Sequence, residues 1–563
     1  MKFIFVFILF FETIYSQNSY PQDYFRLPLD ISMSISGSFG ELRYGHFHTG
    51  IDFRTEKREG LPVFATADGF ISRVKISTGG YGKSIYIDHP NGFTTVYGHL
   101  QCGNGIVQEA ILKEQYSQKK YEIEFFPKPT ELIVKKGDII AYSGNTGGSG
   151  GPHLHFEIRE TKTENVINPL YFGFDKNLID TLPPQILNVL VYPIGENSQV
   201  NGLQKPIVLP LSLQNDGTYL AEKVLANGKI GFGLNSYDTS NFNYGRNGIF
   251  KLETYLNGMP YFGYQFDNFS FNDTKYIHNF IDYQLYQTQK QRFQKLFVGT
   301  NYPINIIKTI KNNGFVDVTS NFTMNYKIVV QDFHTNKSIV NIPITHAILP
   351  ILQKKEIKKT PYFLKSAIEN SYSKDGISVF VPEQTFFDDF YINFDVKNNQ
   401  LTFHDESVAV QNAYNISIDV TNMDTKEQEK TFIGNIDNGK MEYNTTFRKD
   451  NILSINTKKL GAFLLSKDTI SPKIYKPNFK EGDNMDSLKE LKIYISDNLS
   501  GIKEINAFLN DKWILMEYES KLNRLTHNFN DKMYQIGRNN FKIIVSDNLG
   551  NSTTFESYFL KTK

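Results

Sequence analysis

Short apolar runs separated by glycine-rich turns are the feature that most restricts how this chain can fold. In the first third of the chain, such runs span residues 71–76, 84–88, 94–100, 139–143 and 153–159. Runs of this length at this spacing are typical of β-strands joined by tight turns. They predict a mainly β chain that begins with an antiparallel β domain.

The sequence between two of these runs has a different character. Residues 106–124 are rich in Glu, Lys and Gln and carry apolar side chains near their start. A polar segment with a few spaced apolar residues favours a helix over a strand. We therefore expect a helical insertion in the β domain.

After Pro169 histidine becomes rarer, and a weak internal repeat is visible. The sequence at 180–186 (DTLPPQI) resembles that at 468–474 (DTISPKI), and 327–332 (KIVVQD) resembles 542–547 (KIIVSD). Strands ending in Asp or Asn lead into turns, because these side chains bond nearby backbone groups. Such modules resemble immunoglobulin-like β-sandwiches.

These patterns divide the chain into successive domains. We expect a β domain at 17–175, an immunoglobulin-like sandwich at 176–350, a linker at 351–372, a further β domain at 373–466 and a second immunoglobulin-like sandwich at 467–563. The linker contains the lysine-rich segment 354–359 and a helix-like stretch that follows it.

The first residues have the pattern of a secretory signal peptide. Lys2 precedes an apolar run at residues 3–11, and the small Ser16 fits a cleavage point. The run is far shorter than the roughly 20 residues that span a bilayer. We expect residues 1–16 to direct export to the periplasm or cell envelope, or out of the cell; the alternative is a buried N-terminal strand. No other stretch predicts a transmembrane segment.

Charge and cysteine content exclude several classes of protein. The 60 Lys and Arg residues nearly balance the 59 Asp and Glu residues, which argues against a nucleic-acid binder held by bulk charge. The single cysteine, Cys102, cannot form an internal disulfide, so stability outside the cytoplasm has to come from burial or from metal. We interpret Cys102 as a small hydrophobe rather than a reactive thiol.

Histidines concentrate in the first domain, where six of the eleven lie before residue 156. If residues 45–53 are extended, His48 and Asp52 share one face, with only Gly50 between them. This arrangement would place an imidazole and a carboxylate next to open space.

Further histidines follow at His99 and in the run at 153–159, where His153 and His155 share a face if the run is a strand. Imidazole nitrogens and a carboxylate oxygen are the usual ligands of a catalytic zinc, and three of them leave a fourth position for water. Zinc acidifies that water and polarises a carbonyl, while an unbound histidine acts as a base or donates to an oxyanion. The sequence supplies enough groups for both tasks.

Several segments occur in one order along the domain. They are His48-x3-Asp52, YGHL at 97–100, and GNTG at 144–147 leading to GPHLHFE at 151–157, together with GLPVFATADG at 60–69 and VKKGDII at 134–140. In this combination they closely resemble peptidase family M23, the LytM or lysostaphin-type zinc endopeptidases. The resemblance covers about residues 36–170.

The resemblance implies an antiparallel β groove with one zinc ion per chain. His48, Asp52 and His155 would bind the zinc. His99 and His153 would flank it, activating water and stabilising the tetrahedral intermediate. The implied substrates are stem or cross-bridge peptides of peptidoglycan.

Two residues near the implied ligands leave alternatives open. His46 forms a second His-x-His with His48 and could be the ligand instead, although only His48 has the family's spacing to Asp52. Glu157 alternates onto the face of His155, where it could be a base but more plausibly supports the site or the structure.

The sequence also departs from the family pattern. Gly150 occupies a position where many members have Thr, which removes one hydroxyl near the site. The insertion at 103–130 is longer than in compact members and could wall the groove or narrow the choice of substrate.

Three functions fit these observations. The first is an exported zinc endopeptidase of the cell wall; the second is a catalytically silent protein that recruits or activates another wall hydrolase. The third uses the same chemistry on a protein substrate. The C-terminal modules could bind an envelope protein or a glycan, or hold the first domain away from a surface.

Overall fold

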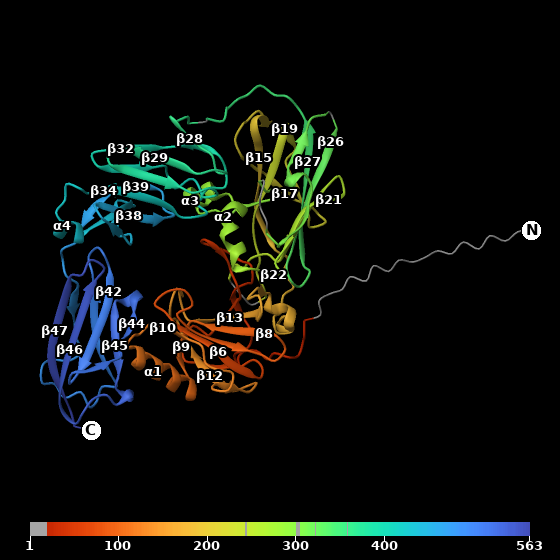
Figure 1. The fold of residues 1–563 in the computed structure, drawn as a ribbon. Coiled ribbons are helices and arrows are strands. Elements are labelled where there is room, and N and C mark those ends of the chain that lie inside the picture. The colour runs from red at the N-terminus through yellow and green to blue at the C-terminus, as the bar shows by residue number, and fades with distance from the viewer. Residues whose placement is uncertain (1–19, 242–244, 300–303, 321, 357, 563) are drawn as a thin grey trace, which may run out of the picture.

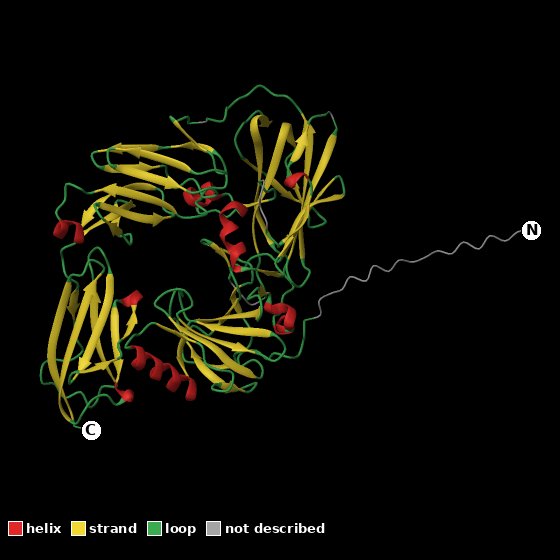
Figure 2. Cartoon of the chain, in the orientation of Figure 1, coloured by secondary structure: helices red, strands yellow, loops and turns green. Residues whose placement is uncertain are grey.

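The computed structural model describes residues 20–562 apart from 242–244, 300–303, 321 and 357, and strands dominate these residues (Figure 2). Four β units follow one another around a ring, so that the last, in blue, lies beside the first, in red and orange (Figure 1). We define the units by their strands: β1–β14, β15–β27, β28–β39 and β40–β47. The mainly β prediction is confirmed, while the predicted signal peptide at 1–16 lies outside the described residues.

The first unit is built on an antiparallel sheet with β13 near its middle. In hydrogen-bonded order its main strands are β1 (Ile35–Gly37), β4 (Ile51–Arg54), β13 (His153–Glu160), β8 (Phe93–Gly98), β7 (Lys83–Asp88), β6 (Gly69–Ile76) and β10 (Ile123–Phe125), with β11 (Ile133–Val134) on β6 and β14 (Val166–Ile167) on β13. A smaller sheet pairs β5 (Pro62–Phe64), β12 (Ile139–Ser143) and β9 (Leu100–Gly103). Along β13, Leu154, Phe156 and Ile158 are fully buried in the core.

Two predicted strands of this unit are interrupted. The run at 94–100 is two strands, because His99 adopts a φ of 59°, in the left-handed region, between the end of β8 and the start of β9. Residues 45–53 are not continuously extended either: β3 (His46–Phe47) pairs with β2 (Leu42–Arg43), and β4 begins only at Ile51. Gly50 allows the intervening turn to approach β13, since a Cβ there would lie 2.2 Å from the carbonyl oxygen of Phe156.

The predicted helical insertion is present as α1 (Ile106–Gln118), but it ends earlier than expected. Lys119 adopts the left-handed conformation and its N–H bonds Gln115 O, which terminates the helix. The chain then turns into β10, which pairs with β6, so the end of the segment predicted as helical is a strand. No helix within the described ranges is both long and apolar enough to cross a bilayer.

The second unit is one connected sheet of twelve strands rather than two separate sheets. Its hydrogen-bonded order is β16 (Ile207–Leu209), β15 (Gln185–Val200), β19 (Val224–Tyr237), β27 (Lys337–His346), β26 (Thr323–Gln331), β20 (Lys251–Leu256), β21 (Met259–Gln265) and β24 (Ile307–Ile310), with β17 (Leu211–Leu213), β18 (Tyr219–Ala221), β23 (Gln294–Lys295) and β25 (Val316–Val318) beside this path. The halves stay connected because β19 pairs with β15 along most of its length and with β27 at its start.

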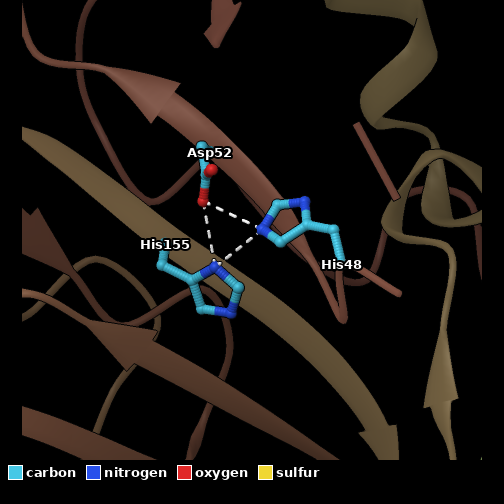
Figure 3. A group of neighbouring side chains, drawn as sticks. All are labelled: His48, Asp52 and His155. Carbon is cyan, nitrogen blue, oxygen red and sulfur yellow. Dashed lines mark hydrogen bonds and ion pairs between the residues drawn. The ribbon is translucent and has the colours of Figure 1, made fainter. Parts of the chain in front are cut away.

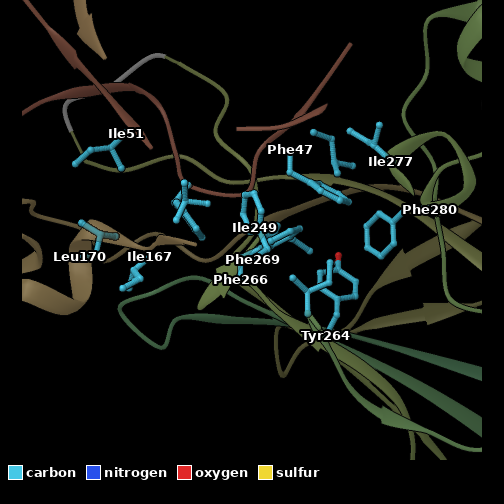
Figure 4. Packing of buried hydrophobic residues seen from close by; sticks show 14 of the residues in the cluster. Phe47, Ile51, Ile167, Leu170, Ile249, Tyr264, Phe266, Phe269, Ile277 and Phe280 are labelled. Carbon is cyan, nitrogen blue, oxygen red and sulfur yellow. The ribbon is translucent and has the colours of Figure 1, made fainter. Parts of the chain in front are cut away.

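The first and second units share one hydrophobic core (Figure 4). Phe47 of the first unit packs edge-on against Phe269 and Phe280 of the second. Phe269 lies in β22 (Asn268–Phe269), which pairs with β14 and so extends the sheet of the first unit, and Phe280 ends the short helix α2 (Ile277–Phe280), which precedes α3 (Tyr283–Gln289). Because Phe47 directly precedes His48, this shared core fixes the segment that carries a predicted zinc ligand.

The third unit has a two-stranded sheet and two five-stranded sheets, the fourth has two four-stranded sheets, and each unit has its own core. In the third unit, β28 (Tyr362–Leu364) pairs with β31 (Phe390–Ile392), and the helix α4 (Thr425–Glu429) lies outside the sheets. One five-stranded sheet has the order β29 (Asn370–Lys374), β30 (Ile377–Val381), β34 (Tyr414–Asp419), β38 (Ile452–Thr457) and β37 (Phe447–Lys449). The other has the order β32 (Phe394–Lys397), β33 (Gln400–Phe403), β39 (Gly461–Lys467), β35 (Thr431–Asp437) and β36 (Lys440–Glu442). The fourth has β40 (Lys473–Tyr475), β41 (Glu490–Ser496), β45 (Arg524–Asn528) and β44 (Glu517–Glu519) in one sheet, and β43 (Lys512–Ile514), β42 (Ile502–Leu509), β46 (Gly537–Asp547) and β47 (Ser552–Lys561) in the other. The prediction of a helix-like stretch after residue 359 is wrong, because the strands β28 and β29 form there.

The fourth unit closes the ring by contacting the first. Trp513 packs edge-on against Tyr116 of α1, with ring centroids 5.4 Å apart. The buried Lys83 ammonium pairs with Glu517 at 2.8 Å. The insertion that carries α1 therefore forms a docking surface for the last unit.

Candidate metal centre

Three buried side chains of the first unit converge on one point (Figure 3). His48 Nε2 lies 3.1 Å from Asp52 Oδ1 and 3.1 Å from His155 Nδ1, and His155 Nδ1 lies 2.9 Å from the same Asp52 oxygen. Each residue is at most 3% exposed. The structure thus brings together the three residues that the sequence analysis assigned to zinc.

Strand pairing explains this convergence. In the register of β4 and β13, Asp52 lies directly opposite His155, and on the other side of β13 His155 lies opposite Gly98 of β8. Gly98 presents no side chain to the His155 ring, since a Cβ there would lie 3.3 Å from the Cβ of His155. His48 reaches the pair from the turn before β4, although that turn is not the extended segment that the sequence predicted.

The outer contacts of the two histidines determine which ring nitrogen carries the proton. His48 Nδ1 donates to the backbone carbonyl of Ser38 at 2.8 Å, and His155 Nε2 donates to Glu157 Oε1 at 2.8 Å. When both rings are neutral, His48 Nε2 and His155 Nδ1 therefore present lone pairs. Together with Asp52 Oδ1, three acceptors face one another with no proton between them, which is a set that fits a divalent cation.

The types of ligand atom determine which cation fits the centre. Two imidazole nitrogens and one carboxylate oxygen are a common catalytic zinc set and leave a fourth position open. Hydrogen bonds from metal-binding histidines to a carbonyl or a carboxylate orient the rings, and both occur at this centre. The residues present therefore fit zinc, held by His48, Asp52 and His155.

The pKa values of these groups show how strongly they interact. Burial lowers the pKa of His48 to about 4. Burial also opposes protonation of His155, but bonds and charges from Asp52 and Glu157 outweigh it and raise that pKa to about 9. Burial raises the pKa of Asp52, yet the two histidines hold it well below its ordinary value. A proton held on His155 therefore has to leave when a metal ion binds.

Glu157 supports the centre rather than joining it. Burial would raise its pKa, but the Arg159 guanidinium, whose Nε donates to Glu157 Oε2 at 2.7 Å, lowers the pKa below its ordinary value. Tyr81 also donates to Glu157 Oε1 at 2.5 Å, and its ring stacks on His155 with centroids 4.9 Å apart. The structure thus places Glu157 as the partner that fixes the His155 ring.

Arg43 holds the second oxygen of Asp52. Its Nη2 lies 2.5 Å from Asp52 Oδ2, leaving Oδ1 for the two histidines. Gly37 permits this pair, since a Cβ there would lie 2.1 Å from that Arg43 nitrogen and 2.6 Å from Asp52 Oδ2.

Sequence reasoning missed most of these supporting residues. The alternation along β13 carries Arg159 onto the face of His155 and Glu157, and this signal could have been found. No local pattern in the sequence points to Arg43, Tyr81 or Ser38, which only the strand topology brings to the centre.

His99 and His153 lie beside the three converging groups. His153 Nδ1 donates to Gly151 O at 2.8 Å, and its buried Nε2 has no hydrogen-bond partner and lies 3.6 Å from Asp52 Oδ1. His99 Nδ1 donates to Thr146 O at 2.8 Å, and the two rings have centroids 4.6 Å apart.

His99 is held neutral in this environment. Burial, together with the nearby His155 and His153, lowers its pKa to about 3. With its Nδ1 proton committed to a carbonyl, His99 keeps a lone pair on Nε2, as His153 does. Both residues therefore offer a hydrogen-bond acceptor beside the candidate zinc position.

Other histidines of the first unit lie elsewhere. His46 is exposed, and its Nδ1 donates to Tyr44 O, so it is not one of the three converging groups. His89 is buried in the turn after β7, with its ring nitrogens on Asp68 O and Thr95 Oγ1 at 2.8 Å each.

Comparison with known proteins agrees with this geometry. Residues 46–115 and 128–169 match peptidase family M23, and residues 361–468 match a Zu5-like domain. The match to family M23 contains His48, Asp52, His99, His153 and His155. The first unit is therefore a peptidase domain of the M23 type.

Individual relatives match the same part of the chain. The DD-carboxypeptidase/endopeptidase Mpg of Neisseria meningitidis serogroup B is 37% identical over 130 residues, which are 22% of this chain and 24% of that protein. The peptidoglycan DD-endopeptidase ShyA of Vibrio cholerae is 30% identical over 139 residues, 24% of this chain and 26% of that protein. The chain thus spans about a quarter of the length of these relatives.

Among solved structures, the catalytic domain of lysostaphin from Staphylococcus simulans is 26% identical, covers 25% of this chain and 92% of that chain, and has a TM-score of 0.20. This score is too low to support an argument about the whole molecule. The identification therefore rests on the sequence match and on the geometry of the centre.

Proposed function

We propose that this protein is an exported zinc metalloendopeptidase that hydrolyses peptide bonds in the stem or cross-bridge peptides of peptidoglycan. The observation that carries the proposal is the convergence of three ligand atoms, from His48, Asp52 and His155, beside the rings of His99 and His153. The names of the relatives Mpg and ShyA support the substrate class.

The chain's own residues divide the work of hydrolysis. His48 Nε2, Asp52 Oδ1 and His155 Nδ1 would hold one zinc ion, which when bound acidifies water and polarises a carbonyl. His153 accepts a proton at Nε2, because its bond to Gly151 keeps the other proton on Nδ1. We assign His99, whose ring centroid lies 4.6 Å from that of His153, to stabilising the tetrahedral intermediate, as the family resemblance implies.

Export places the enzyme where peptidoglycan is found. The proposal assigns residues 1–16 to a signal peptide and the mature chain to the periplasm or the cell envelope. The apolar run at residues 3–11 after Lys2 supports this assignment.

Zinc content of single variants tests the ligand assignment. We expect about one zinc per chain in the unaltered protein, measured by mass spectrometry, and almost none in His155→Ala. His46→Ala is the matched control, because His46 is an exposed histidine two residues from a proposed ligand. Zinc retained in His155→Ala, or lost in His46→Ala, would contradict the assignment.

Cleavage of purified sacculi tests the substrate. The zinc-loaded protein should release soluble muropeptides, and a chelator should abolish the release. A protein with full zinc that cleaves glycine-rich peptides but not sacculi would favour a protein substrate. Full zinc without cleavage of either would favour a silent protein that recruits another hydrolase.

A further inference from the structure

A second group of potential ligands lies in the second unit, outside the histidine centre. Asp180, Asp238 and Asp332 each place a carboxylate oxygen within 4.8 Å of the others. Asp180 precedes β15, Asp238 follows β19 and Asp332 follows β26, so three separate segments meet here. The triad is formed by the fold and not by one acidic stretch of sequence.

The three carboxylates are close together and shielded from water. Asp238 is 7% exposed and Asp332 is 2% exposed, while the side chain of Asp180 is 4% exposed. Burial, together with the neighbouring carboxylates, raises the pKa of Asp238 to about 8 and that of Asp180 to about 6. Like charges in a buried site repel, and this arrangement is costly unless a cation compensates it.

The protein supplies little positive charge to this group. Within the described part of the chain, the one chargeable nitrogen in ion-pair range is His334 Nδ1, at 4.0 Å from Asp180 Oδ2. Asn336 donates to both oxygens of Asp332 from its backbone N–H and its side-chain amide, at 2.9 and 2.7 Å. These contacts fix Asp332 but leave the negative charges of Asp180 and Asp238 with little compensation.

One oxygen of the triad and two neutral oxygens beside it lack hydrogen-bond partners. Ser240 Oγ, Asn247 Oδ1 and Asp238 Oδ1 are buried without a hydrogen-bond partner, and Ser240 and Asn247 are 2% and 5% exposed. All three residues line one small cavity together with Asp180, with a volume of about 30 Å³. Such orphaned atoms are uncommon in proteins unless a ligand or an ion satisfies them.

The fourth unit provides an internal comparison. In its group of Asp468, Asp497 and Asp547, the sequence repeat relates Asp468 to Asp180 and Asp547 to Asp332. Asn551 bonds Asp547 at 2.8 and 2.7 Å as Asn336 bonds Asp332. The two units therefore share one scaffold.

The two groups differ in the hydrogen-bond donors that surround their carboxylates. In the fourth unit, backbone N–H groups of Ile470 and Ser500 reach both oxygens of Asp468, and those of Leu499 and Gly501 reach Asp497 Oδ2. In the second unit, Asp180 accepts from the Leu182 N–H at 3.2 Å. Each group keeps one carboxylate oxygen and one serine hydroxyl buried without a partner: Asp238 Oδ1 with Ser240 Oγ, and Asp497 Oδ1 with Ser500 Oγ. The group in the second unit has fewer backbone donors and the additional orphaned Asn247 Oδ1, so its geometry calls more strongly for a cation.

We propose that Asp180, Asp238 and Asp332 bind one Ca²⁺ ion, with oxygens of Ser240 and Asn247 available to complete its coordination. Carboxylate, hydroxyl and amide oxygens are the ligands of a hard cation, in contrast to the nitrogen-rich zinc centre. Calcium accepts six to eight oxygens in irregular geometry, whereas Mg²⁺ demands an octahedron and keeps its waters. This site is independent of the proposed peptidase activity.

Calcium titration of the full-length, zinc-loaded protein tests the proposal. We expect heat of binding in calorimetry, and a rise in Tm of several degrees at about 100-fold excess of Ca²⁺ over Kd. Mg²⁺ should bind at least about tenfold more weakly. No Ca²⁺-dependent heat and no shift in Tm would overturn the proposal, and equal binding of Mg²⁺ would overturn the choice of cation.

Asp238→Asn separates loss of the site from loss of the fold. The variant should bind one Ca²⁺ fewer per chain, yet without Ca²⁺ its Tm should equal or exceed that of the unaltered protein, because one repelling charge is gone. Asp216→Asn, at an exposed acid of the same unit, is the control and should bind Ca²⁺ normally. Unchanged Ca²⁺ binding in Asp238→Asn would contradict the assignment of the site.

Discussion

The backbone carbonyl of Ser38 accepts a hydrogen bond from His48 Nδ1 at 2.8 Å. The hydroxyl of the same Ser38 accepts from the backbone N–H of Gly248 at 2.9 Å. Because Gly248 belongs to the second unit and follows Asn247 of the proposed calcium site, one residue joins the two candidate metal centres. The second unit therefore supports the zinc ligand directly and is more than a spacer.

Removal of the Ser38 hydroxyl should weaken this support. In Ser38→Ala the carbonyl remains for His48, but the half-buried Gly248 N–H loses its acceptor, which costs about 0.5–1.5 kcal/mol. We expect a lower free energy of unfolding and a few-fold faster loss of zinc to a chelator. Ser36→Ala on the neighbouring strand is the control, since the Ser36 hydroxyl has only a long contact of 3.5 Å. Equal zinc release from both variants would argue against coupling through Ser38.

The carboxylate of Glu157 should matter for zinc affinity. In Glu157→Gln the His155 ring loses its charged partner and the Arg159 guanidinium loses its ion pair, so zinc should bind about 10–100-fold more weakly. A competition titration with a chromophoric chelator measures this change. Glu160→Gln, at the exposed end of the same strand, should bind zinc as the unaltered protein does. A Glu157→Gln variant with unchanged affinity would show that this carboxylate does not support the centre.

Gly37 should be intolerant of a side chain for a reason specific to the centre. The Cβ of Gly37→Ala would overlap the Arg43 guanidinium and Asp52 Oδ2, so the arginine has to leave the carboxylate. We expect roughly tenfold weaker zinc binding, in line with the loss of a group that orients a ligand. Gly79→Ala is the control, because no atom lies within 4 Å of its Cβ. Similar zinc affinity in the two variants would contradict this role of Gly37.

The contact between the fourth and first units can be followed through Trp513, the single tryptophan of the chain. Burial lowers the pKa of Lys83, but Glu517 outweighs burial and raises it. Glu517→Gln leaves the buried ammonium without its charged partner and should weaken docking by about 1 kcal/mol, because Glu517 is itself partly exposed.

Fluorescence measures this weakening. As docking loosens, the Trp513 ring should become more exposed and its emission should shift to longer wavelength. Glu519→Gln, whose carboxylate pairs with Arg524 inside the fourth unit, is the matched control. A red shift in Glu519→Gln but not in Glu517→Gln would contradict the role of Glu517 in docking.

The sequence predicted the strands of the first unit and the residues that converge, because alternation and motif spacing are local signals. His155 and Asp52 are examples, since their motifs are short and each lies on a strand. The break at His99 was not visible, because a left-handed φ at a histidine depends on the surrounding fold. Arg43, Tyr81 and Ser38 reach the centre only through pairing and packing between distant segments.

The same limit applies beyond the first unit. The sequence shows 180–186 and 468–474 as an internal repeat, and the structure places the first aspartate of each in a carboxylate group. Nothing in the sequence separates the group with more backbone donors from the group with fewer. That difference depends on which N–H groups the surrounding loops direct toward each carboxylate.

Cleavage of purified sacculi by His153→Ala tests the central claim most directly. His153 holds a buried lone pair beside the proposed zinc ligands but is not itself one of them. We expect this variant to retain about one zinc per chain and to release muropeptides at least about 100-fold more slowly than the unaltered protein. Release at the unaltered rate, with zinc in place, would contradict the assignment of His153 as the residue that accepts the proton.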